Sequence, residues 1–172
     1  PLRRALKRTA KRLGYEVVPS SWMPSAAFAE HLRELFTRLR IDCVLDVGAN
    51  RGQFREFLRT FVEYRGRILS FEPIPEHVTL LRAAAAADPL WDICGFALGA
   101  EETQMNLNVM EVDTFSSFLT PDSATVDQFS HENVVDHVQL VDVRRLDVVL
   151  PKLRDRYAFE HLYLKMDTQG FD

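Results

Sequence analysis

Short apolar runs alternate with helix-periodic segments through the middle of the chain. The runs at residues 43–47, 67–71 and about 91–97 are short enough to be buried strands. Between them, apolar residues recur every three to four positions over 53–63 and 76–87, which predicts two helices. This alternation predicts an α/β fold, in which right-handed crossovers place helices on both faces of a mostly parallel sheet.

Two more helices are predicted before the first strand. The first covers residues 2–13 and ends at Gly14. After a linker at 19–24, the second covers 25–40, with Ser25 as its N-cap. The apolar residues of this second helix fall on one face, and they are Phe28, Leu32, Leu35, Phe36 and Leu39.

The pattern changes near residue 103. Polar and apolar residues alternate over 105–109, which predicts a half-exposed strand, and residues 113–132 form a polar loop. Another strand is predicted at 138–143, a short helix at 146–153 and a final strand at 161–166. The last strand would join the parallel sheet as its fourth core strand.

We divide the chain into an N-terminal helical extension, residues 1–40, and a domain, residues 41–172. The net charge is −4, yet the arm at 1–18 is basic. Six basic residues precede Glu16, the first acidic one: Arg3, Arg4, Lys7, Arg8, Lys11 and Arg12. This arm either contacts anionic lipid at the inner face of a membrane or is a solvated surface helix. A nucleic-acid partner is not expected, because the rest of the chain is acidic.

Composition sets further limits. A chain of 172 residues predicts one domain with a real core, and it contains no run of about 18 apolar residues that would span a membrane. The two cysteines, Cys43 and Cys94, lie in predicted strands without metal-ligand spacing, so we expect reduced thiols, no metal and a cytoplasmic location. His77 is expected at the surface of a helix. The chain runs from Pro1 to Asp172, and we expect both ends to be cut.

The first strand ends in the most informative segment. Asp46 closes the apolar run, and Gly48 and Gly52 follow in a turn that leads into a helix. Such turns let a backbone approach a nucleotide. A carboxylate in the position of Asp46 would repel a pyrophosphate but attract a sulfonium or ammonium group. Glu72, after the next strand, has the spacing of a carboxylate that accepts hydrogen bonds from ribose hydroxyls. These residues favour S-adenosylmethionine over a dinucleotide.

Five motifs follow one another along the chain: Asp46-Val47-Gly48-Ala49-Asn50-Arg51-Gly52-Gln53-Phe54, Phe71-Glu72-Pro73, Ala97-Leu98-Gly99, Ser116-Ser117 and Leu164-Lys165-Met166-Asp167-Thr168-Gln169-Gly170. Together they resemble the FkbM family of S-adenosylmethionine-dependent methyltransferases. The resemblance covers roughly residues 41–172. It implies a Rossmann-like class I methyltransferase fold, and O-methylation of a hydroxyl on a sugar, glycolipid or secondary metabolite.

The resemblance also implies roles for particular residues. Four residues of the first motif would line the methionine side of the cofactor: Asp46, Gly48, Asn50 and Gly52. Glu72 would hold the ribose hydroxyls, Ala97 would pass beneath the adenine, and Ser117 would hydrogen-bond cofactor or acceptor. The family's sheet has three further strands after the one that holds Asp167. We therefore expect this chain to be truncated after its fourth core strand, and whether the 172-residue piece is active stays open.

Lys165 and Asp167 are the predicted catalytic residues. They lie two apart on a strand and so share a face, and Asp167 is at the carboxyl end, where open α/β sheets bind ligands. Asp167 would orient the acceptor hydroxyl or accept its proton. The alternative is an ion pair of Lys165 and Asp167 that ties the strand to a neighbouring helix.

Two other functions stay open at this point. One is a nicotinamide-dependent enzyme on a similar sheet. The other is a non-catalytic module that binds the cofactor or a partner protein. The sequence predicts neither the identity of the acceptor nor the oligomeric state.

Overall fold

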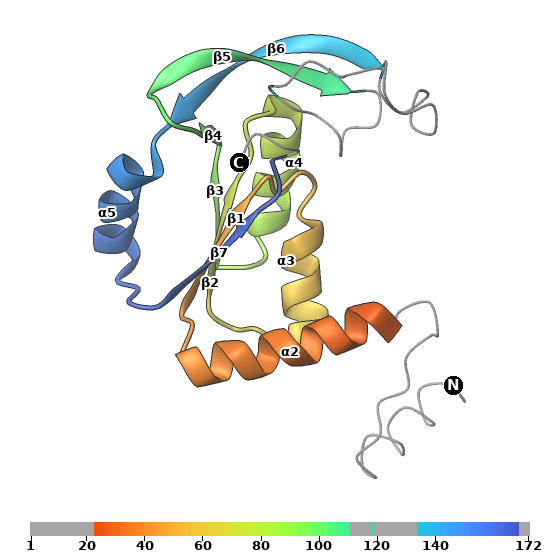
Figure 1. Ribbon diagram of the computed structural model, residues 1–172, viewed down its shortest axis with the longest axis vertical. Coiled ribbons are helices and arrows are strands. Elements are labelled where there is room, and N and C mark those ends of the chain that lie inside the picture. The colour runs from red at the N-terminus through yellow and green to blue at the C-terminus, as the bar shows by residue number, and fades with distance from the viewer. Residues whose placement is uncertain (1–22, 111–117, 119–133, 169–172) are drawn as a thin grey trace.

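The computed structural model describes residues 23–110, 118 and 134–168. Its centre is a parallel sheet of the order β3-β2-β1-β7 (Figure 1). The strands are Cys43–Val47 (β1), Arg67–Phe71 (β2), Trp91–Cys94 (β3) and Leu162–Met166 (β7). All of the pairings in this sheet are parallel, with Asp46 of β1 opposite Ser70 on one side and Lys165 on the other. The predicted α/β fold with a mostly parallel sheet is confirmed.

Helices cover both faces of this sheet. On one face lie α2 (Met23–Leu39), α3 (Gln53–Phe57), a π-helix η2 (Leu58–Val62) and α4 (Pro75–Ala85) (Figure 1). On the other lies α5 (Leu146–Tyr157), which ends at Ala158 in a left-handed conformation. The strands alternate accordingly, with Val44 facing the first group and Leu45 facing α5.

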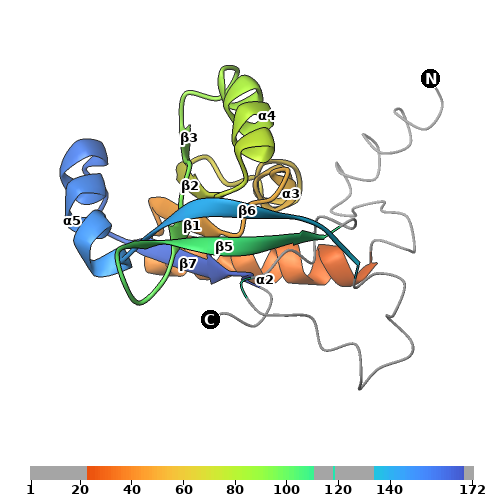
Figure 2. The same ribbon diagram turned by 90° about the horizontal axis from the view of Figure 1, so that it is seen from above.

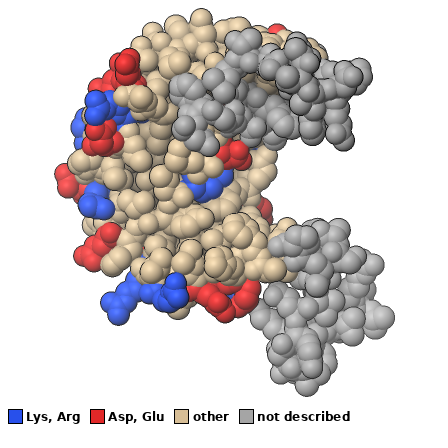
Figure 3. All heavy atoms as spheres, viewed as in Figure 1, with Lys and Arg blue, Asp and Glu red and all other residues tan. Residues whose placement is uncertain are grey.

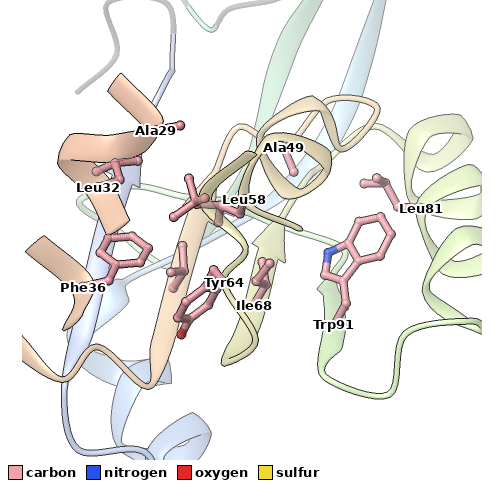
Figure 4. Close-up of a cluster of buried hydrophobic side chains, with 11 residues drawn as sticks. Ala29, Leu32, Phe36, Ala49, Leu58, Tyr64, Ile68, Leu81 and Trp91 are labelled. Carbon is pink, nitrogen blue, oxygen red and sulfur yellow. The ribbon is translucent and has the colours of Figure 1, made fainter. Parts of the chain in front are cut away.

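The larger core lies between the sheet and the first group of helices. Its buried side chains come from α2, η2, α4 and three strands (Figure 4), and they include Leu32, Phe36, Leu58, Ile68, Leu81 and Trp91. Burial of each large apolar side chain contributes about 1.5–3 kcal/mol. The core thus fixes α2 against α3 and η2, next to the carboxyl end of β1.

The second predicted helix, 25–40, is present as α2 and begins at Met23, two residues before the expected N-cap, whereas the first, 2–13, lies outside the described residues. Leu32 and Phe36 of the predicted apolar face are buried. Phe28 and Leu39, near the two ends of the helix, are each 47% exposed. The middle of the predicted face therefore packs on the core, whereas its two ends do not.

The segment predicted as one helix at 53–63 changes type within its length. It is an α-helix to Phe57 and a π-helix to Val62, and Glu63 ends it in a left-handed conformation. The Tyr64 amide donates to the Leu58 carbonyl across this wide last turn. π-turns of this kind are often found at functional sites.

A second sheet lies above the carboxyl ends of the parallel strands, and β5 and β6 cross over them when seen from above (Figure 2). It has the order β4-β6-β5 and consists of Ala97–Leu98, Val135–Arg144 and Thr103–Met110. β5 and β6 are antiparallel and contain the two strands predicted after residue 103. The apolar residues Leu107, Val109 and Val141 of this second sheet pack on Ile74, which follows β2.

One predicted strand, 91–97, is wrong as a single element. β3 ends at Cys94, and the Phe96 amide donates to the Cys94 carbonyl in a tight turn around Gly95. The chain then enters β4, which pairs with β6 in the other sheet. The mostly apolar character of this segment hid the change of direction, although Gly95 interrupts it at the turn. Ala97 is buried as well, but in different surroundings.

A charged network connects α3 and η2 to the loop before β3. The Asp88 carboxylate accepts hydrogen bonds from Arg55 at 2.6 Å and from Arg59 at 3.0 Å. Burial raises the pKa of Asp88, but the hydrogen bonds from Arg59 and Arg55 outweigh it and hold the pKa at about 2. The carboxylate is therefore more acidic in the folded chain than in the unfolded chain.

We expect Asp88→Asn to lower the free energy of unfolding by about 1–2 kcal/mol at neutral pH. This is less than the full effect of the pKa shift, because solvent partly screens the ion pairs of Asp88. Because the folded pKa of about 2 lies below the ordinary 3.8, this contribution is complete above about pH 4 and is lost as the pH falls towards 2. Urea unfolding at several pH values measures it. The exposed Asp155→Asn is the matched control. A deficit that stayed constant down to about pH 2 would contradict the assignment.

Candidate active site

A cavity of about 520 Å³ opens at the carboxyl ends of β1, β2 and β7, beneath the second sheet. This is the edge at which open α/β sheets bind ligands, and the volume lies within the roughly 300–1,000 Å³ usual for small-molecule sites. Its walls come from the helices α2 and α3, the turns after β1 and β2, the strands β4 and β5, and the end of β7. The residues that the argument below uses are Gly48, Asn50, Glu72, Ala97, Lys165 and Asp167.

The turn after β1 requires glycine at two points, for different reasons. Gly48 has φ +73°, and a Cβ there would lie 2.1 Å from the carbonyl oxygen of Asp167. Gly48 therefore lets the turn touch the end of β7. Gly52 has φ +84°, and a Cβ there would press on Leu81 and Trp91, so it lets α3 pack against the core. Gly52 does not line the main cavity, whereas Gly48 and Asn50 do.

Glu72 joins two turns at the floor of the cavity. It is 4% exposed. One carboxylate oxygen accepts a hydrogen bond from the backbone N–H of Asn50 at 2.7 Å. The other accepts one from the backbone N–H of Ile74 at 3.0 Å. The prediction that His77 is at the surface is wrong. Its ring is buried with Nδ1 3.6 Å from the Glu72 carboxylate, because Pro75 starts α4 and turns this position back towards the strand end.

Asp46 lies beneath the cavity and does not line it. Its side chain is completely buried, and Oδ1 lies 3.1 Å from the Lys165 Nζ. Burial raises the pKa of Asp46, and the ammonium of Lys165 opposes this shift. The predicted direct contact between Asp46 and a ligand therefore does not match its position. Asp46 acts on the cavity through Lys165, which separates it from the open space.

Lys165 binds the turn as well as the carboxylate. Its Nζ donates to the carbonyls of Val47 at 3.2 Å and Gly48 at 3.0 Å. It also lies 3.7 Å from Oδ2 of Asp167, whose side chain is 56% exposed. The two predicted catalytic residues are thus side by side in the cavity. The partner that Lys165 pairs with most closely belongs to the neighbouring strand, and not to a helix as the alternative assumed.

Other predicted and unpredicted residues complete the walls. Ala97 lines the cavity from β4, while Ser117 lies outside the described residues. Sequence analysis missed Phe28 of α2 and the pair Phe54 and Phe57 of α3, which all line the cavity. The three-residue spacing of the pair looked like ordinary helix core. Its position directly after the glycine turn was the signal that could have placed it in the site.

Two further findings concern the described part of the chain. Its acidic, histidine and cysteine side chains nowhere gather in a group of three or more that could hold a metal ion. None of its helices combines the length and the apolar character needed to cross a bilayer.

Comparison with known proteins identifies this arrangement. A family model described as the methyltransferase FkbM domain matches residues 46–172, from the end of β1 onward. The chain belongs to the FkbM methyltransferase family. No curated protein matches the chain. The matched region includes the glycine turn, Glu72, Lys165 and Asp167, which are the parts of this FkbM domain that meet at the cavity.

The FkbM domain offers a test of the buried ion pair. We expect Lys165→Met to lower the free energy of unfolding by about 3–5 kcal/mol, because it leaves the Asp46 carboxylate buried without its counter-charge. The double variant Asp46→Asn with Lys165→Met should recover at least half of this loss, since neither charge then remains. Urea unfolding of the two single variants and the double variant measures the coupling. Strictly additive losses would show that the pair is not a unit.

Proposed function

We propose that this FkbM methyltransferase uses S-adenosylmethionine to methylate a hydroxyl of a sugar, glycolipid or secondary metabolite. The observation that supports the proposal is the charge of the cavity. Among the described residues that line it, Glu72 and Asp167 are anionic and Lys165 is the one cation. Because Lys165 pairs with the buried Asp46, the open space faces two carboxylates and little positive charge.

The residues present fit a cationic adenosyl donor and do not fit a diphosphate. Unit charges about 4 Å apart interact by roughly 4 kcal/mol at an effective dielectric constant of 20, so the two carboxylates would repel a pyrophosphate strongly. The same carboxylates would attract the sulfonium and amino groups of S-adenosylmethionine. This contrast disfavours a nicotinamide dinucleotide.

Each wall of the cavity has a part in this proposal. Glu72 would accept hydrogen bonds from the ribose hydroxyls, since each of its oxygens keeps a second lone pair beside the backbone amide that it binds. Ala97, together with Ile74 and Leu98, provides an apolar enclosure for the adenine. The turn at Gly48 and Asn50 would hold the amino-acid end.

When bound, the donor supplies a methyl group on a positively charged sulfur. The protein's task is then to align the acceptor and take its proton. Asp167 is exposed to the cavity and 3.7 Å from Lys165, which holds it in place and lets it accept the proton of the hydroxyl. A positioned base typically contributes 10²–10⁴-fold in rate, and alignment by the largely apolar walls up to roughly 7–11 kcal/mol.

We expect Glu72→Gln to weaken the binding of S-adenosylhomocysteine by about 10- to 100-fold, because one oxygen that accepts hydrogen bonds becomes a donor facing an amide. Isothermal titration calorimetry on the full chain measures this affinity, and the same titration with NAD tests the rival cofactor. Glu76→Gln, on the exposed side of α4, is the matched control. Equal affinity in the two variants, or preferential binding of NAD, would overturn the cofactor assignment.

Asp167→Asn should weaken the binding of S-adenosylhomocysteine less than Glu72→Gln does, and should slow methyl transfer by about 10²- to 10⁴-fold, since the amide keeps the shape but cannot take a proton. Transfer of a labelled methyl group to glycolipid extracts gives the rate. A variant that kept the parental rate would remove Asp167 as the base.

A further inference from the structure

One part of the cavity wall is not used by the cofactor assignment, and we call the space beside it the compartment. This part of the wall comes from the start of α2 and from α3, and it consists of Ser25, Phe28, Gln53, Phe54 and Phe57. On the face seen in Figure 3, the charged side chains lie mostly along the left and lower edges, and the middle of the face is largely uncharged. Three of the five side chains of the compartment are phenylalanine rings, and none of the five carries a charge.

Three phenylalanine rings form a continuous aromatic wall from the catalytic end outward. The Lys165 Nζ lies 5.7 Å from the centre of the Phe54 ring. The Phe54 and Phe57 rings are stacked at 6.2 Å. Phe57 in turn stacks on Phe28 of α2 at 5.7 Å, with an angle of 14° between the ring planes. The wall thus begins beside Lys165, the neighbour of the proposed base Asp167, and ends at Phe28 of α2.

Core packing does not account for the outer end of this wall. Phe28 is 47% exposed, although an aromatic ring gains most from full burial. The described polar groups here are few, and the Gln53 side chain already accepts the Arg51 amide and donates to Asn50. A sugar ring would need several hydrogen-bond partners in this compartment, whereas an apolar group needs only the aromatic surface.

We propose that the wall of Phe28, Phe57 and Phe54 is the acceptor subsite, and that it takes an apolar ring or a chain of several carbons on the alcohol to be methylated. The inference rests on the proposed function and adds the acceptor class to it. The reacting hydroxyl lies beside Asp167, and the apolar part runs along the rings towards α2. Phe28, on the helix before the first strand, is then a specificity-determining residue.

The test compares two probes that share a hydroxyl-bearing head and differ in the apolar part. The full chain is saturated with S-adenosylhomocysteine and titrated with octyl β-glucoside, below its micelle concentration, and with methyl β-glucoside. We expect octyl β-glucoside to bind at least about 10-fold tighter, and Phe28→Ala to reduce this preference by about 3- to 10-fold. Phe28→Leu, which keeps an apolar side chain, should retain most of it.

Leu39→Ala is the matched control, because Leu39 lies on the same helix with the same exposure of 47% but away from the cavity. It should leave the preference unchanged, and Phe28→Ala should leave the affinity for S-adenosylhomocysteine unchanged. Equal binding of the two glucosides, no binding of either, or equal effects of Phe28→Ala and Leu39→Ala would overturn the subsite while the cofactor assignment stands. Failure of S-adenosylhomocysteine itself to bind would overturn the proposed function and the subsite with it.

Discussion

The ion pair between Lys165 and the buried Asp46 holds the functional end of this domain together. A completely buried carboxylate is costly without a counter-charge. Here Lys165 supplies the counter-charge, and Ser70 donates a hydrogen bond to the other carboxylate oxygen. The same ammonium donates to the carbonyls of Val47 and Gly48, so it ties the glycine turn of β1 to the end of β7. One cation thereby positions both the turn that would hold a ligand and the neighbouring Asp167.

The same end of the domain also depends on the close approach of two backbone segments, the turn after β1 and the end of β7. The turn can lie against β7 only because Gly48 has no side chain, and Glu72 holds the other end of the turn through the Asn50 amide. The cavity that results has apolar walls and an acidic floor. A charged group that binds there loses its water shell and is surrounded by the fixed dipoles of the protein instead. Positioned charges affect a reaction most strongly in such a site, because water does not screen them.

Sequence patterns predicted the parts of the molecule that depend on local regularity. The strands β1 and β2 were placed at their observed bounds, and Glu72 and Asp167 were expected at strand ends because parallel strands bring these ends together. What failed depends on tertiary contacts. Periodicity cannot show that Asp46 is covered by Lys165 from another strand, or that His77 turns inward onto Glu72. Nor could it show that Phe54 and Phe57 meet Phe28, because that contact joins two helices.

The polar atoms beneath the cavity form a line that crosses the whole parallel sheet. Trp91 of β3 donates to Ser70 of β2, which bonds Asp46 of β1, which pairs with Lys165 of β7. A shift of any of these strands by one residue would turn its polar side chain towards the opposite, apolar face of the sheet. The neighbouring side chains would then lose their hydrogen-bond or ion-pair partner. A misaligned pairing would lose one of these interactions at every strand. The polar row that reaches the cavity at Lys165 therefore also favours the correct assembly of the sheet.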